Sequence, residues 1–170
     1  MLIGVISDTH DRLPVITTAF TAFKDHSVDL VVHCGDWKSP ETMQHVLDVA
    51  ESLSLSLIGV LGNNDTDTLG FLQKKRGYRI EEGVLEVTLS GKKCAVYHGH
   101  HAPTLRKVKE SGDYDIILLG HTHKPKVEKI DNTLLVNPGS TAFAIPRNKE
   151  WSPTVMLLDT SSMNVETLIL

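Results

Sequence analysis

The chain contains several short clusters of Asp, His and Asn, and most of them follow directly on an apolar run. The first is formed by Asp8 and His10, just after the run 2–6. A carboxylate and an imidazole can bind a metal ion together, or they can simply end a strand. Further clusters repeat the pattern along the chain: Gly35-Asp36, Gly62-Asn63-Asn64-Asp65, His98-Gly99-His100 and Gly120-His121-Thr122-His123. Imidazole, carboxylate and amide oxygen without thiolate predict a site for Mn²⁺, Fe²⁺, Co²⁺, Ni²⁺ or Zn²⁺.

The number of ligand candidates predicts more than one ion. The clusters supply seven such side chains: Asp8, His10, Asp36, Asn63, His98, His121 and His123. A single ion does not need so many, whereas two ions about 3.5–4 Å apart that share one carboxylate use the whole set. This is the spacing of two-metal phosphoester chemistry. We therefore expect two divalent ions, and among the ions named above we expect Mn²⁺ first.

The elements between the clusters predict how the side chains come together. Apolar runs at 2–6, 28–33 and 57–61 are typical of buried strands, and the apolar spacing at 13–23 and 39–53 is typical of helices. A βαβαβ order implies parallel strands with right-handed crossovers. Because the carboxyl ends of such strands gather the chemistry of α/β sheets, we expect the clusters to meet there.

The second half of the chain is richer in strands. Two hairpins, a short helix and three further strands are predicted, at 84–97, 127–136, 103–110, 115–119, 154–158 and 165–170. We find no fixed repeat, low-complexity tract or linker. The chain is therefore predicted to form a single α/β domain over residues 1–170.

The motifs DxH, GD, GNxD, HGH and GHTH, in this order from Asp8 to His123, resemble those of the calcineurin-like metallophosphoesterases. The resemblance is closest to the small single-domain prokaryotic phosphodiesterases of that family. Each motif alone is weak, but all of them in order, with suitable strand context, are specific. The resemblance implies a four-layer αββα sandwich of two mixed β-sheets flanked by helices, with the metals at the carboxyl ends of the strands.

The same resemblance assigns the ligands. It implies Asp8, His10 and His123 on one ion, Asn63, His98 and His121 on the other, and Asp36 as the bridge. We expect Asp36, Asn63 and His98 to serve catalysis as well. A hydroxide that bridges the two ions would attack phosphorus, while the ions neutralise charge on the phosphoryl oxygens.

The expected activity is that of a metal-dependent phosphodiesterase acting on a small phosphodiester. A phosphomonoesterase or nucleotide hydrolase with the same site is the alternative among enzymes. A non-catalytic protein-binding scaffold is the alternative outside them, since one retromer subunit resembles this family and has lost part of its ligand set. This chain keeps every ligand candidate, which favours catalysis.

One position departs from the larger phosphatases that share these motifs. Their motif reads GNHE or GNHD, and its His is thought to protonate the leaving group, whereas this chain has Asn64 there. Asn cannot act as a general acid at neutral pH, although a good leaving group needs no acid. His100 or His101 could donate the proton instead, or they could simply be solvated.

Several residues near the motifs can be interpreted as structural as well as functional. We expect Asp65 to orient a ligand or a loop, and His33 to pack at the end of a strand. Arg12 and Lys124 flank ligand clusters and could contact a phosphate, but such side chains are most often solvated. Trp37 could line the substrate pocket, although packing against the following helix is the interpretation we prefer.

Further predictions concern loops. Asn63 could cap a helix over 67–74 instead of binding metal. The segment 137–140 is predicted to be a structural turn, which the resemblance places near the site. Walls that select the substrate are expected from Trp37, His101 and the loop 143–147.

The composition is that of a soluble globular protein. In 170 residues, 41% are hydrophobic and 22% charged, and the net charge of −4 without a basic cluster gives no support for bulk nucleic-acid binding. No apolar run approaches the roughly 18 residues of a membrane span, and the first run lacks the basic flank of a signal peptide. Cys34 and Cys94, expected inside strands, are interpreted as buried small side chains. We therefore expect a cytoplasmic protein, and a homodimer as in relatives of this size.

Overall fold

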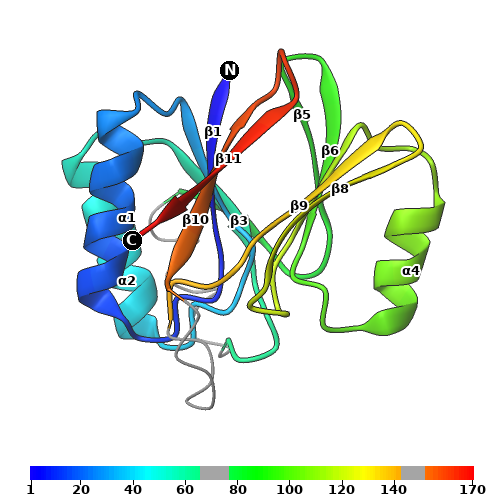
Figure 1. Cartoon of the computed structure of the whole chain (residues 1–170). Coiled ribbons are helices and arrows are strands. Elements are labelled where there is room, and N and C mark those ends of the chain that lie inside the picture. The colour runs from blue at the N-terminus through cyan, green and yellow to red at the C-terminus, as the bar shows by residue number, and fades with distance from the viewer. Residues whose placement is uncertain (66–76, 143–151) are drawn as a thin grey trace.

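Two mixed β-sheets lie face to face, and helices cover their outer faces (Figure 1). The computed structural model describes residues 1–65, 77–142 and 152–170. The predicted helix over 67–74 and the specificity loop 143–147 lie outside the described residues. None of the helices in the described ranges combines the length and the apolar character needed to cross a bilayer.

The first sheet is built around parallel strands. In spatial order its strands are β11 (Asn164–Ile169), β10 (Thr154–Asp159), β1 (Leu2–Ile6), β2 (Leu30–His33), β3 (Leu57–Val60) and β4 (Arg79–Glu81). β1, β2 and β3 are mutually parallel, as predicted, and the crossovers between them are α1 (Leu13–Asp25) and α2 (Pro40–Ser52). Ser39 caps α2 by accepting a hydrogen bond from the Thr42 N–H, and Pro40 occupies the first turn, where it costs no hydrogen bond.

The second sheet combines two hairpins with one central strand. Its spatial order is β5 (Leu85–Leu89), β6 (Lys92–Tyr97), β7 (Ile116–Leu119), β9 (Thr133–Pro138) and β8 (Pro125–Ile130). β6, β7 and β9 are parallel, and α4 (Ala102–Glu110) connects β6 to β7 across the outer face. The carboxyl ends of its parallel strands therefore reach one edge of this sheet too.

The order of layers explains why the sequences of the central strands are continuous apolar runs. Val31 of β2 packs beneath α1 and α2, while Val32, its neighbour, packs between the two sheets. In the second sheet, Leu118 lies between the sheets and Leu119 lies on the α4 side. Since successive side chains point to opposite faces, a strand buried on both sides needs apolar residues at every position. The predicted αββα sandwich is confirmed.

One strand was not predicted, and two local predictions need correction. β4 was not predicted, because only Ile80 of its three residues is buried and no alternation results. Cys34 follows β2 instead of lying within it, although it and Cys94 are both buried free cysteines. Asn137 and Pro138 still belong to β9, so the predicted turn begins only at Gly139, where φ is +83°.

Candidate metal centre

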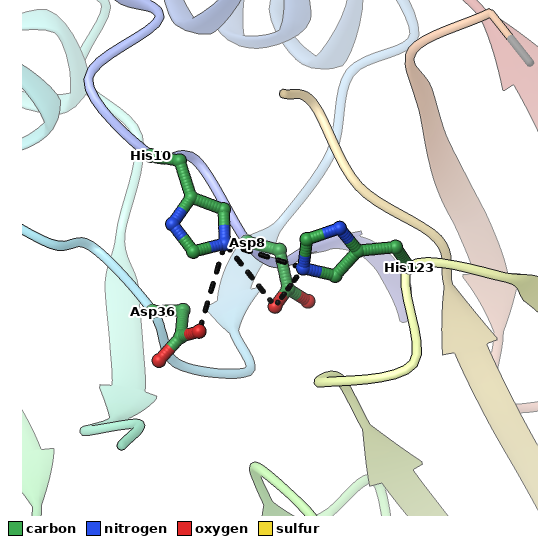
Figure 2. A group of neighbouring side chains, drawn as sticks. All are labelled: Asp8, His10, Asp36 and His123. Atoms are coloured by element: carbon green, nitrogen blue, oxygen red, sulfur yellow. Dashed lines mark hydrogen bonds and ion pairs between the residues drawn. The ribbon is translucent and has the colours of Figure 1, made fainter. Parts of the chain in front are cut away.

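The predicted ligands follow the strand ends on backbone that curls sharply. Several of these non-glycine residues have left-handed φ angles: Asp8 (54°), His10 (36°), Asp36 (59°), His121 (68°) and His123 (57°). This conformation costs about 1–2 kcal/mol per residue, so the surrounding contacts must hold it in place. Because the backbone curls, side chains two residues apart can face the same point, as Asp8 and His10 do (Figure 2).

Four side chains from three segments converge on one small space. The ligand atoms of Asp8, His10, Asp36 and His123 all lie within 4.8 Å of one another (Figure 2). His123 Nε2 is 3.1 Å from Asp8 Oδ1, and His10 Nε2 is 3.6 Å from Asp36 Oδ2. The two imidazole Nε2 atoms face each other at 3.2 Å. Two carboxylates and two imidazoles in this arrangement are a donor set suited to a divalent ion.

Asp8 provides a direct test of that fit. Its carboxylate is fully buried, and Oδ2 accepts hydrogen bonds from Ser7 Oγ (2.6 Å) and from the backbone N–H of His121 (3.0 Å). Oδ1 has no hydrogen-bond partner in the described residues, although His123 is close. A buried oxygen without a partner is costly. One oxygen is thus fixed by the protein, and the other is left for a cation.

His98 shows the same division of roles. It is fully buried, and its Nδ1 lies 2.8 Å from the carbonyl oxygen of Cys34. Since a carbonyl only accepts, Nδ1 carries the proton, and in the neutral ring Nε2 is then free to bind a metal. Nε2 is buried without a hydrogen bond, 3.3 Å from Asp36 Oδ1.

Asp36 stands between two groups of predicted ligands. Oδ2 faces His10, and Oδ1 faces His98, whose ring centroid lies 5.1 Å from that of His121. Asn63, the remaining candidate, is exposed just after β3. The structure therefore gathers Asp8, His10, Asp36 and His123 tightly, and it places His98, with His121 next to it, at the other carboxylate oxygen of Asp36.

The contact between Asp36 and His98 favours the charged form of each side chain. Burial alone would raise the pKa of Asp36, but the contact with His98 and the donors of Asn64 hold that pKa well below its usual range. Burial alone would lower the pKa of His98, but the carboxylates of Asp36 and Asp8 outweigh the effect of burial and raise that pKa. Asp36 is therefore a carboxylate at neutral pH, which complements a cation.

Asp65 holds the loop beneath Asp36. Its Oδ2 accepts hydrogen bonds from the N–H groups of Gly62 (2.6 Å) and Asp36 (3.2 Å), and Oδ1 accepts one from Lys38 N–H (2.7 Å). The prediction that Asp65 orients a loop is confirmed. Both carboxylate oxygens of Asp65 thus accept hydrogen bonds from the backbone, and the neighbouring candidate Asp36 remains available to bind a metal ion.

His33 and Trp37 pack beneath the ligand loops. His33 Nδ1 accepts a hydrogen bond from the Gly35 N–H (3.1 Å), so Nε2 donates to Thr9 Oγ1 (3.3 Å). Its ring stacks on Trp37 at 3.6 Å, and Trp37 donates from Nε1 to the Val60 carbonyl (2.9 Å). Trp37 is fully buried, so it is a packing residue and not a pocket wall. Burial, with the nearby charge of His98, lowers the pKa of His33 to about 3.

The candidates for a proton donor differ in position. His100 is exposed, and its ring centroid lies 5.6 Å from that of His98 and 6.5 Å from that of His121. His101 instead precedes α4, with Nδ1 bonded to Thr104 Oγ1 at 2.9 Å. Arg12 and Lys124 are exposed.

Sequence reasoning missed the residues that clamp the first ligand loop. Ser140 Oγ donates to the Asp8 carbonyl (2.8 Å), and the Ala142 N–H donates to the same oxygen (3.2 Å). Asn137 Nδ2 donates to the Gly120 carbonyl at 2.7 Å. The segment 137–140 therefore does lie beside the site, as the resemblance implied. Ser7 carried no signal, because a single Ser after a strand is common.

Known proteins share this architecture. A family model described as a calcineurin-like phosphoesterase superfamily domain matches residues 1–163. The chain is 34% identical over 173 residues to phosphodiesterase MJ0936 of Methanocaldococcus jannaschii, covering 100% of this chain and 99% of that protein. The solved structure of an archaeal phosphodiesterase matches with a TM-score of 0.84 at 33% identity, covering 100% of both chains. Vps29 of Entamoeba histolytica with zinc has a TM-score of 0.68 at 20% identity over 100% of this chain and 98% of that one, a likeness of fold alone.

Proposed function

The chain belongs to the calcineurin-like phosphoesterase superfamily, and from this premise we propose that it hydrolyses phosphodiesters with two divalent metal ions. It is a metal-dependent phosphoric ester hydrolase with an Asp/His cluster suited to divalent ions. The observation that carries the finer proposal is Asp36, whose two carboxylate oxygens face His10 and His98, in separate groups of candidate ligands. A shared carboxylate is what a two-ion site requires.

We assign the ligands as the motifs imply: Asp8, His10 and His123 for one ion, Asn63, His98 and His121 for the other, and Asp36 for both. When bound, the ions would activate a water molecule as the nucleophile and neutralise charge on the phosphoryl oxygens. The chain's own part is to hold the ligands in place. Ser7 fixes one oxygen of Asp8, and the Cys34 carbonyl fixes the tautomer of His98.

Asn64 bears on the choice of substrate. At the position where larger phosphatases carry a proton-donating His, Asn64 donates hydrogen bonds to Asp36. An amide cannot protonate a leaving group, so the reaction depends on how readily the alcohol leaves. This favours diesters with good leaving groups. A similar protein named phosphodiesterase and a similar solved structure of an archaeal phosphodiesterase support a diester over a monoester.

The scaffold alternative has less support. The likeness to Vps29 concerns the fold, whereas this chain keeps the whole predicted ligand set, including the buried unpartnered atoms of Asp8 and His98. Buried polar atoms that make no hydrogen bond are costly, and a pure scaffold has no use for them at the carboxyl ends of its strands.

We also propose Mn²⁺ as the native ion, a cytoplasmic location and a homodimer. Oxygen and imidazole ligands suit Mn²⁺, and the free, buried Cys34 and Cys94 are compatible with a reducing compartment. Metal analysis of the protein purified from its own host, fractionation of that host and light scattering test the three proposals separately.

The decisive experiment is hydrolysis of bis(p-nitrophenyl) phosphate and p-nitrophenyl phosphate by metal-stripped protein, with Mn²⁺, Ni²⁺ or Zn²⁺ restored. We expect metal-dependent turnover that prefers the diester and is lost in Asp36→Asn but kept in Asp25→Asn, an exposed carboxylate at the end of α1. A preference for the monoester would assign the site to a phosphomonoesterase. Binding of the ions without any turnover would favour the scaffold.

A further inference from the structure

A cavity lies beside the metal centre, at the edge of the second sheet near α4. Its volume is about 390 Å³, which is within the range of small-molecule sites. Gly99 and Gly120 form part of its wall. Gly99 directly follows His98, and Gly120 directly precedes His121. The cavity and the metal centre therefore share two backbone segments.

The floor of this cavity is apolar. Leu119 of β7 and Leu135 of β9 line it while being 6% and 2% exposed, and Leu105 of α4 packs against the same cluster. These side chains lie on the α4 side of the sheet, away from the core between the sheets. Such a floor can bind a ring by removing its apolar surface from water.

The rim of the cavity is basic. Lys109 of α4, Lys124 and Lys126 line it, and no Asp or Glu stands among the described residues that do so. Glu128, which does not line the cavity, pairs with Lys126 at 2.7 Å and also interacts electrostatically with Lys109. In a chain whose net charge is −4, three lysines around one cavity favour an anionic ligand.

The cavity cannot be the place of reaction. The described residues that line it include neither a carboxylate nor an imidazole, so it offers no ligand set for a metal ion. Its wall is nevertheless built before any ligand arrives, because Asn137 Nδ2 donates to both the Gly120 carbonyl (2.7 Å) and Thr122 Oγ1 (3.1 Å). A preformed cavity next to the reacting centre suits a part of the substrate that does not react.

We propose that this cavity is a second substrate subsite, which takes the ester substituent that stays on phosphorus while the metal centre takes the phosphoryl group. The substituent that fits is a ring bearing a further negative charge, with the ring on Leu119 and Leu135 and the charge near Lys109. This inference rests on the proposed phosphodiesterase function. A carboxylated aryl group and a nucleoside with an additional phosphate share this chemistry.

Kinetics with a constant leaving group test the subsite. We would compare p-nitrophenyl diesters whose second substituent is methyl, phenyl, 4-carboxyphenyl, thymidin-5′-yl or thymidin-5′-yl with a 3′-phosphate. Phenyl should improve kcat/KM over methyl by about tenfold through KM, since the ring is removed from water. The carboxylate or the 3′-phosphate should add a further gain, and whichever gains more identifies the source of the ligand.

Variants that remove a lysine charge test whether the preference for a charged ring arises in this cavity. Lys109→Gln should reduce the preference for 4-carboxyphenyl over phenyl about threefold, the size expected for a partly exposed charge pair. Lys107→Gln, an exposed lysine of the same helix that does not line the cavity, should leave that preference unchanged. Equal ratios in wild type and Lys109→Gln would overturn the assignment of the subsite.

A binding measurement separates this inference from the proposed function. Titration calorimetry of metal-free protein with 4-carboxyphenyl methyl phosphate should give weak binding that Lys109→Gln reduces and Lys107→Gln does not. If no diester is turned over with any ion, the proposed function fails, and this titration still decides the subsite. If the methyl diester is turned over but neither ring nor charge matters in kinetics or binding, only the subsite fails.

Discussion

The side-chain amide of Asn64 donates a 2.6 Å hydrogen bond to Oδ2 of Asp36, while the backbone N–H of Asn64 donates to Oδ1 of the same carboxylate at 2.9 Å. The residue that replaces the proton donor of larger relatives thus holds the central carboxylate of the candidate metal centre. Asn64 is exposed, so its side chain is also open to a substrate.

Asn64→His should reduce the dependence of the rate on the leaving group. A positioned general acid contributes about 10²–10⁴-fold, so a grafted His should recover about tenfold for a diester that releases phenol, with little change for p-nitrophenol. Rates for both leaving groups, measured with Asn64→Ala as the control for loss of the hydrogen bond, check this. An unchanged ratio in the His variant would show that proton donation does not limit the reaction.

Removal of divalent metal should destabilise the protein. An ion at about one hundred times its Kd adds about 2.7 kcal/mol, which for a chain of this size raises the midpoint of thermal unfolding by about 5–10 °C. Calorimetry with chelator and with Mn²⁺ measures the shift. Asp8→Asn should lose most of this shift, because it removes the negative charge of a buried carboxylate whose Oδ1 makes no hydrogen bond and lies 3.1 Å from His123 Nε2. Equal metal-induced shifts in both proteins would contradict ligation by Asp8.

His33 should make the metal-free protein sensitive to acid. Its pKa is lowered from 6.5 to about 3 in the folded state, so below pH 6.5 the unfolded chain binds a proton that the folded chain does not. This contribution to stability is complete above pH 6.5 and falls by about 1.4 kcal/mol per pH unit as the pH decreases toward 3. Urea unfolding from pH 7 to 4 should therefore give a shallower decline for His33→Gln, which can replace both hydrogen bonds. Parallel pH profiles of the two proteins would refute a neutral His33.

Gly120→Ala should disrupt the site more than it disrupts the backbone. A Cβ at Gly120 would overlap Ser7 Oγ and would lie 2.8 Å from the Cys34 carbonyl and 3.0 Å from Asp8 Oδ2. We expect about 1–3 kcal/mol of destabilisation and a clear loss of activity. Gly112→Ala is the control, since its Cβ would meet no atom within 4 Å although φ is +71°. Urea unfolding and diester turnover check both variants, and full activity in Gly120→Ala would mean that the loop readily moves aside.

Much of the fold and the site could be predicted from local patterns. Strands buried on both faces, such as β1 and β7, must be apolar throughout, and their ends must carry the polar residues because only there does the chain leave the core. The position of each cluster after such a run was therefore sufficient to place Asp8, Asp36 and His121 at one edge.

Only the tertiary structure decided which atoms meet. Neither the pairing of β10 with β1 nor the position of β9 between β7 and β8 follows from local periodicity, since both depend on contacts between distant segments. The same holds for His33 beneath two ligand loops, for Asn64 on Asp36 and for the cavity beside α4. The sequence determined the kind of chemistry through the types of side chain and their order, and three-dimensional packing determined which of them are buried, oriented and left without a partner.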